Sequence, residues 1–368
     1  NDSAYIFVTV SINPSAANLP FVVTDSIEIN YNGNKKWVQL NAYGSNANFL
    51  RNKIVSTNET WNNTRPYIIL GSLIVEPNAT LTINEGSKIY VHADAPIIIN
   101  GTLNVAGNFY DSTRVVFSGD RLDEPYRDFP ASFPGLVFTA SSKNNLLSYA
   151  TIKNAYQGLV VIGPAGSGIK LTLNQTIIEN AYDAGILGIN TSITANNLLV
   201  SNCGKNMLLI NGGNYNFIHC TSVAYSNSFL QHKDPLLGIS NSLSANGSTT
   251  INNLSALFRN CIFWGEGTGL VPSEVVIAKQ GVNPFSVLFD GVLWRVPSDP
   301  VFANITGNNI KNLPPLFDSI NTSNRFYNFR LKEGSPAINK GVATSVNIDL
   351  DGKPRPVGAP DLGAYEKQ

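Results

Sequence analysis

The sequence has little charge, a single methionine and no long apolar run. Charged residues make up 14% of the 368 residues, whereas about 25% is usual for soluble proteins. Basic and acidic residues number 25 each, so the formal net charge is zero. Without an excess of one sign the chain has no general field to attract nucleic acid or an anionic bilayer, and neither partner is expected. No apolar run approaches the roughly 18 residues of a transmembrane helix, so no transmembrane segment is expected.

Cysteines are also scarce, and the three present (Cys203, Cys220 and Cys261) cannot all pair within one chain. A disulfide framework is therefore excluded, and we expect buried thiols that behave as small apolar side chains. No cofactor is expected. Asp349-Leu350-Asp351-Gly352 resembles the start of a calcium loop, but the remaining ligands of an EF-hand are missing, so an Asp-Gly turn is the better interpretation. Calcium is left open, with no specific motif that indicates it.

Asparagine, glycine and proline supply the polarity that charge does not. The chain contains 47 Asn, 30 Gly and 20 Pro, which suits turns and stacked loops better than long helices. From residue 66 onward, short β-type runs recur with turn residues between them, and no helical period competes with them. The clearest are 67–70, 80–83, 97–99, 114–117 and 136–138.

The middle of the chain repeats itself. The pentapeptide at 152–156, IKNAY, returns at 178–182 as IENAY and more loosely at 199–204, so that Asn154, Asn180 and Asn202 are 26 and then 22 residues apart. Units of this length made of short strands and turns predict one coil of a parallel β-helix, with coils about 4.8 Å apart. Asparagine at one corner of successive coils would form a ladder, since each amide can donate to one neighbour and accept from the other. A leucine-rich repeat would need leucines at fixed spacing, and that pattern is missing.

We divide the chain into three parts. Residues 1–62 predict a small N-terminal antiparallel β domain, with strands at 5–10, 27–31 and 37–40 and an Asn32-Gly33-Asn34 hairpin turn. Residues 63–300 form the predicted right-handed parallel β-helix. Residues 301–368, where the repetition fades, are predicted to be a C-terminal cap region that continues the β-helix, in which Arg355 is expected to pair with Asp361 or Glu366.

Two stretches carry a family resemblance. The strings EGSPAINKG (333–341), DLDGKPRP (349–356) and DLGAYE (361–366) are together similar to a C-terminal signature of secreted or surface β-helix proteins, including many from Bacteroides-type bacteria. Residues 119–155 resemble early coils of surface proteins from the same group. With the repeats, the resemblance extends from about residue 66 to the end.

The resemblance implies a pectate-lyase-like right-handed parallel β-helix and an exported protein. The implied location is extracellular or at the cell surface, where many such proteins are anchored by lipid in the outer membrane. The chain begins at Asn1 rather than Met, so we expect a mature or trimmed form. The resemblance implies no reaction, because this architecture carries lyases, hydrolases, esterases and inert binders alike. The expected role is carbohydrate binding or an envelope-associated interaction, with a polysaccharide or cell-envelope glycan as partner.

The alternative is a polysaccharide lyase or glycoside hydrolase that uses a charged cluster between two predicted strands. A hydrolase needs two carboxylates about 5–9.5 Å apart, and a lyase needs a base and a cation for the substrate carboxylate. The structural interpretation is that Arg–carboxylate pairs hold a protruding loop in place. The polygalacturonase-type Asp-Asp and Gly-His-Gly patterns are missing. The catalytic candidates are Asp120, Asp123, Glu124, Arg127 and Asp128, and the sugar-binding candidates are Tyr126, Phe129 and Trp264.

Two further features are predicted. Residues 226–256 interrupt the repeat, which predicts a loop that projects from the β-helix and could form a groove wall. His219 lies in a coil-like stretch, and we expect a packed histidine rather than a catalytic base.

Overall fold

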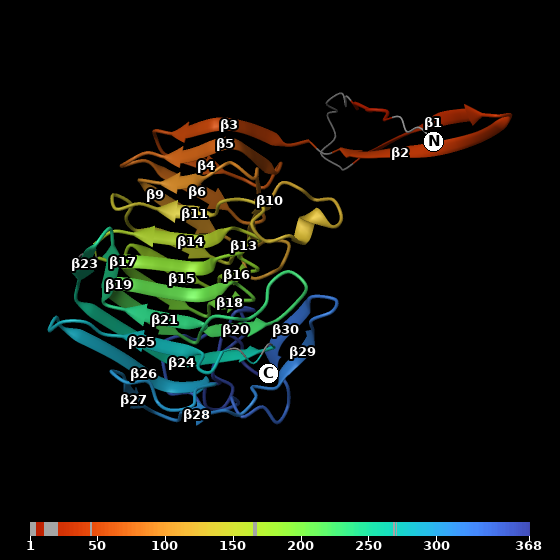
Figure 1. The fold of residues 1–368 in the computed structure, drawn as a ribbon. Coiled ribbons are helices and arrows are strands. Elements are labelled where there is room, and N and C mark those ends of the chain that lie inside the picture. The colour runs from red at the N-terminus through yellow and green to blue at the C-terminus, as the bar shows by residue number, and fades with distance from the viewer. Residues whose placement is uncertain (1–4, 11–20, 45, 165–167, 268, 270) are drawn as a thin grey trace.

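The computed structural model describes residues 5–10, 21–44, 46–164, 168–267, 269 and 271–368. It is almost entirely β-structure, with one sheet of 24 strands that pair in parallel and wind into stacked coils (Figure 1). The predicted parallel β-helix is confirmed. The strands fall into three columns, A, B and C, which each coil visits in that order.

Column A holds the first parts of β3 (Asn48–Val55) and β5 (Tyr67–Val75), β7 (Lys88–Val91), β10 (Val115–Gly119), β13 (Ala150–Lys153), β16 (Ile177–Glu179), β18 (Leu199–Ser201), β20 (Thr221–Tyr225), the second parts of β24 (Leu254–Glu266) and β26 (Phe285–Trp294), and β28 (Ile310–Lys311). Column B holds the second parts of β3 and β5, β8 (Ile97–Ile99), β11 (Leu136–Phe138), β14 (Gln157–Ile162), the first parts of β17 (Ala184–Asn196) and β19 (Lys205–Ile218), β21 (Leu237–Ser240) and β25 (Val275–Ala278). Column C holds β4 (Glu59–Trp61), β6 (Thr80–Asn84), β9 (Thr102–Ala106), β12 (Asn145–Ser148), β15 (Leu171–Asn174), the second parts of β17 and β19, the first parts of β24 and β26, and β27 (Asn304–Thr306).

Alternating side chains give the coils a closed apolar interior. In column A, Ile152, Ile178 and Val200 are register partners on successive coils, and all three are fully buried. Branched and aromatic side chains suit such strands because they pack on the pleated surface. The thiols of Cys203, Cys220 and Cys261 are free and buried, which confirms their apolar role.

The asparagines form the corner that follows column A. Asn154, Asn180 and Asn202 come directly after register partners in β13, β16 and β18, so they lie in one file. Their φ angles are 65°, 55° and 52°, a left-handed conformation that asparagine tolerates better than most residues. The predicted stacking is therefore confirmed.

A hairpin precedes the β-helix. Strands β1 (Phe21–Tyr31) and β2 (Asn34–Gly44) pair antiparallel, and Asn32 and Gly33 have φ angles of 44° and 77°, as the predicted turn requires. The hairpin lies apart from the coils (Figure 1). The strand predicted at 5–10 is wrong, because these residues have no strand partner. Parallel stacking begins at Asn48, inside the segment that the sequence assigns to the N-terminal domain.

The C-terminal segment folds back along the last coils. The hairpin of β29 (Phe317–Asn321) and β30 (Phe326–Leu331) and the residues after it bury the outer side of column A in a second hydrophobic cluster. Arg355 and Glu366 form a fully buried ion pair at 3.3 Å there, as predicted. The outer face of column A is therefore open only over the earlier coils. Its open part adjoins the loop that contains the short helix η1 (Tyr126–Asp128).

The interruption at 226–256 has three parts. Residues 226–236 form a loop, β21 returns to column B, and β22 (Ser242–Ala245) pairs with β23 (Ser248–Ile251) in an antiparallel hairpin. In the part of the chain that the structure describes, no helix is long and apolar enough to cross a membrane.

Candidate functional site

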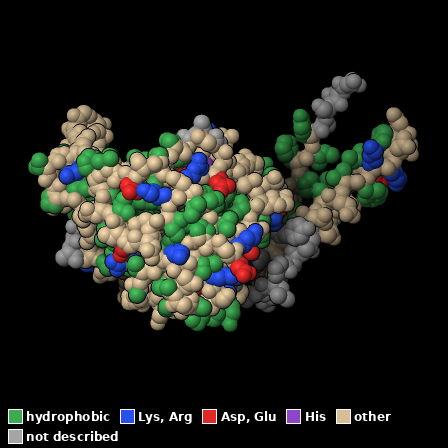
Figure 2. All heavy atoms as spheres, turned by 90° about the horizontal axis from the view of Figure 1, so that it is seen from below, with side chains coloured by type: hydrophobic (Ala, Val, Ile, Leu, Met, Phe, Trp, Pro, Cys, Tyr) green, Lys and Arg blue, Asp and Glu red, His purple; other side chains and the backbone are tan. Residues whose placement is uncertain are grey.

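A groove follows the open outer face of column A. It consists of a cavity of about 540 Å³ beside Lys88, Tyr90, Ser118 and Leu122, and a smaller one of about 140 Å³ beside Glu179, Asn180 and Arg325. Asp128 and Lys153 line both cavities, so the two adjoin. We call this surface the central groove. The face seen from below in Figure 2 carries Lys, Arg, Asp and Glu side chains scattered among hydrophobic and uncharged ones.

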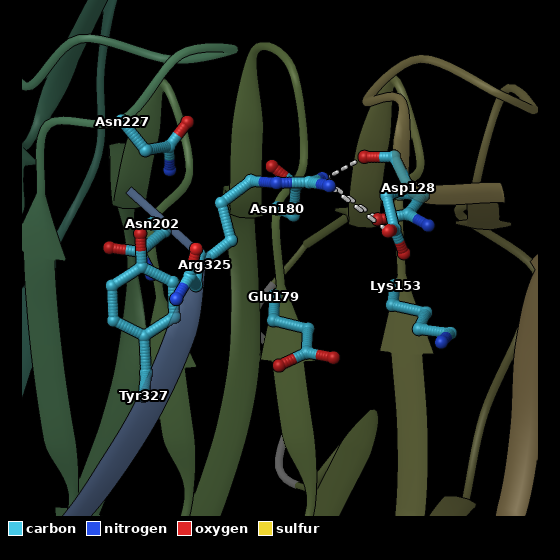
Figure 3. A pocket seen from close by; sticks show the side chains of 10 residues that line it. Asp128, Lys153, Glu179, Asn180, Asn202, Asn227, Arg325 and Tyr327 are labelled. Carbon is cyan, nitrogen blue, oxygen red and sulfur yellow. Dashed lines mark hydrogen bonds and ion pairs between the residues drawn. The ribbon is translucent and has the colours of Figure 1, made fainter. Parts of the chain in front are cut away.

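The floor of the groove is built from outward positions of neighbouring strands. Lys153 of β13 is the register partner of Glu179 of β16, so the two side chains project side by side (Figure 3). Burial raises the pKa of the Glu179 carboxyl, and Asp128 adds to that rise, while Lys153 and Arg114 oppose it. Glu179 therefore keeps its proton to a higher pH than an ordinary glutamate does.

The asparagine file holds the wall of the groove. Asn154 Nδ2 donates to the carbonyl of Arg127 at 2.8 Å, and Asn180 Nδ2 donates to the carbonyl of Asp128 at 3.0 Å. Arg325 reaches across Asn180 and pairs with the Asp128 carboxylate at 3.2 Å (Figure 3). The loop around η1 is thus fixed by two amides and by the C-terminal hairpin.

The carboxylates predicted as catalytic candidates are engaged in ion pairs. The Arg121 guanidinium forms a bidentate ion pair with the Asp123 carboxylate, with N–O distances of 2.8 and 2.7 Å. Arg127 pairs with Glu124. Asp128 is held by Arg325 as described above. The Asp123 and Glu124 side chains are both more than half exposed, so these two pairs lie on the outside of the loop.

Asp120 is held by His92. The Asp120 carboxylate lies 2.7 Å from His92 Nδ1, and His92 follows directly after β7. With this contact, every carboxylate of the predicted cluster has a cationic or titratable partner. Only Asp128, together with Arg127, also lines the central groove.

The three predicted sugar-binding aromatics have structural contacts. Tyr126 stacks under the Arg121 guanidinium at 4.0 Å, and Phe129 packs against Phe229 at 5.1 Å. Trp264 is only 5% exposed and lies in the second hydrophobic cluster. The expected contact between Trp264 and a sugar is therefore blocked, because the C-terminal segment covers this part of column A.

Most residues that line the central groove are not among those predicted from the sequence. Lys153 and Glu179 belong to the predicted repeat, but no role was predicted for them. The signal that could have identified them is the alternation of side chains along a strand, which places both residues on the outer face. Arg325 carried no such signal, since it reaches Asp128 across 197 residues.

The groove offers charge and hydrogen bonding. Lys88 and Lys153 form no ion pair with any described residue, whereas neighbouring Asp128 is paired, so their ammonium groups are available to an anion. Among the described residues no three His, Cys, Asp or Glu side chains gather as a metal site would require. Such a surface can bind a polar, anionic chain through ammonium and amide donors.

Comparison with protein-family models gives no match for the chain. No curated protein matches it either.

Proposed function

We propose that this protein binds an anionic polysaccharide in the central groove and acts as a binding protein rather than an enzyme. The observation that carries the proposal is the open floor of column A, where Lys88 and Lys153, which form no ion pair with any described residue, lie near Asp128, whose carboxylate is already paired with Arg325. Coils repeat about every 4.8 Å, so a polymer that runs along the axis would meet polar side chains at each coil. Uronate-containing glycans are the substrate class that these ammonium groups fit.

We also propose membership in the pectate-lyase-like surface proteins and an exported location. The support is the EGSPAINKG…DLGAYE resemblance together with the parallel β-helix. The test is fractionation and external protease treatment of cells that express the full gene. Recovery of the chain only from the cytoplasm would reject the location.

A second candidate function is cleavage of the bound glycan. The observation that favours it is Glu179, because a carboxyl with a raised pKa can protonate a leaving oxygen. Asp128 lines the same cavity, but its ion pair with Arg325 opposes a role as the second carboxylate of a hydrolase. For a lyase, Lys153 would be the residue placed to interact with the uronate.

The test is native gel electrophoresis of the purified protein in polyuronates and neutral glycans, with parallel assays for new reducing and unsaturated ends. Loss of a charge-assisted hydrogen bond costs about 1.5–3 kcal/mol, so Lys153→Ala should weaken polyuronate binding about tenfold or more. Lys340→Ala removes an exposed lysine outside the groove and is the matched control. No retardation by any polyuronate would reject the proposal. New chain ends that disappear in Glu179→Gln would establish the second candidate instead.

A further inference from the structure

Two stacked tyrosines stand on the surface beside the asparagine file. Tyr156 follows Asn154 by two residues, and Tyr182 follows Asn180 in the same way. The ring centroids of the two tyrosines are 5.7 Å apart, with an interplanar angle of 23°. The two residues are 46% and 52% exposed. A stack of this kind runs along the axis of the β-helix, so one ring faces the preceding coil and the other faces the following coil.

The stack ends at a glycine. Gly204 follows Asn202 by two residues, so it occupies the position of a third ring on the next coil. A side chain could not be added there without rearrangement, because a Cβ on Gly204 would lie 2.3 Å from the carbonyl oxygen of Tyr182. The aromatic stack therefore does not continue on the next coil, and Tyr182 borders a cavity.

That space is a walled pocket. A cavity of about 610 Å³ lies beside Tyr156, Tyr182 and Gly204, and the loop at 227–234 forms its opposite wall. The loop is held in place by Phe229, which packs on Phe129 and under the Arg325 guanidinium. We call this cavity the tyrosine pocket. It shares only Asn227 with the central groove.

Polar groups surround the aromatic floor. The Asp183 carboxylate accepts hydrogen bonds from Gln157 Nε2 at 2.7 Å and from Lys205 Nζ at 3.2 Å, and both Asp183 and Lys205 line the pocket. On the loop side, Gln231 adds an exposed amide. The negative charge of Asp183 is offset by Lys205, so the pocket contains donors and acceptors without a strong field of one sign.

We propose that the tyrosine pocket binds one pyranose ring of a neutral glycan, with the apolar face of the sugar on the Tyr182 ring. The electron-rich face of an aromatic ring attracts the positively polarised C–H groups of a sugar. The carboxylate, ammonium and amide groups at the edge pair with the hydroxyls, as in binding sites where a few polar groups fix the orientation of a ligand. This site goes beyond the proposed function, because it uses other residues and a ligand of different charge.

The test is isothermal titration calorimetry with cello-, xylo-, manno- and galacto-oligosaccharides, using variants of the full chain. We expect at least one of the four to bind, Tyr182→Ala to weaken that binding at least tenfold, and Tyr182→Phe to stay within about threefold, since it keeps the ring. Tyr31→Ala removes an exposed tyrosine from the distant β1–β2 hairpin and should change nothing. Lys153→Ala, which tests the central groove, should also leave this binding unchanged.

Three results would overturn the proposal: no binding of any of the four sugars, equal binding by Tyr182→Ala, or a loss in Lys153→Ala as large as in Tyr182→Ala. Thermal unfolding of each variant shows whether it is folded. If Tyr182→Ala does not fold, Tyr182→Leu keeps apolar bulk without a flat ring and replaces it, with the same tenfold loss expected. Because the ligands differ in charge, failure here leaves the polyuronate test of the central groove unaffected.

Discussion

Asn180 Nδ2 donates a 2.7 Å hydrogen bond to Asn154 Oδ1, one coil away. The same side chain donates to the Asp128 carbonyl, and Asn154 donates to the carbonyl of Arg127. The ladder continues differently at Asn202, whose Oδ1 accepts from the Tyr225 backbone N–H at 2.8 Å. The repeat that stacks the coils is therefore also the device that fixes the wall of the central groove.

Replacing Asn180 with alanine should destabilise the protein by about 1–3 kcal/mol, because partly buried hydrogen-bonding groups lose their partners. Alanine also fits the left-handed backbone less well than asparagine, so Asn180→Gly separates the two effects by removing the amide alone. Asn144→Ala is the control, since Asn144 has a φ of 53° but is exposed and outside the file. Urea unfolding gives the free energies. Equal losses in Asn180→Ala and Asn144→Ala would show that the ladder adds nothing.

His92 should titrate above its ordinary pKa. The hydrogen bond and charge of Asp120 raise the pKa of the exposed His92 ring from 6.5. The contribution of this pair to stability is therefore complete below pH 6.5 and is lost as the pH rises through the higher pKa of the folded protein. Proton NMR of the histidine Cε1–H signals measures the shift, and Asp120→Asn should return the pKa toward 6.5. An unchanged pKa in that variant would contradict the assignment.

His219 provides an internal reference in the same spectra. Its buried ring, which lies 3.1 Å from the Thr344 hydroxyl, has a pKa lowered to about 2, chiefly by burial. We therefore expect its signal to stay constant between pH 4 and 9. A transition of His219 in that range would show that the C-terminal segment does not cover it in solution.

The cysteines should be inert in the native state. Burial raises the pKa of Cys203 to about 12, and the pKa of Cys261 is raised by burial and by nearby Cys220. A thiol reacts as its thiolate, so at pH 8 we expect almost no reaction with Ellman's reagent before denaturation and three equivalents after it. Rapid labelling of the folded protein would contradict the packing of these corners.

The sequence predicted the stacking because similar repeat units place equivalent residues above one another on successive coils. The pairing of Ile152 with Ile178 and the file of Asn154 and Asn180 follow directly from unit-for-unit similarity. The strand predicted at 5–10 failed because β-propensity alone cannot supply a pairing partner. The hairpin at 32–34 succeeded because Asn-Gly has the backbone freedom that its turn needs.

The candidate site was harder to predict because it depends on contacts between unlike segments. The loop at 120–128 was visible from its charge, but its ion pairs were not, since partners such as His92 and Arg325 lie 28 and 197 residues away. Burial of Trp264 likewise depends on the C-terminal segment, which has no counterpart in the repeat. A solenoid reveals its coils in the sequence, whereas its flanking segments follow no period.

Arg325 should couple the C-terminal hairpin to two loops, one at the central groove and one at the tyrosine pocket. Its guanidinium pairs with Asp128 at 3.2 Å and lies 4.2 Å from the Phe229 ring, so one side chain contacts the loops at 120–129 and 226–234. Arg325→Ala should cost about 1–2 kcal/mol through loss of a partly buried ion pair and a cation–π contact. Hydrogen exchange should then accelerate in both loops, with no change in the coils at 67–106.

Arg325→Lys distinguishes the two contacts. A lysine keeps the charge but lacks the planar group that covers an aromatic face, so we expect protection to persist at 120–129 and to fall at 226–234. Arg330→Ala is the control, because Arg330 belongs to the same hairpin but pairs with Asp351 instead. Exchange that stays slow in both loops of Arg325→Ala would mean that the two asparagine bonds alone fix the groove wall. In that case the C-terminal hairpin would line the central groove without holding its loop in place.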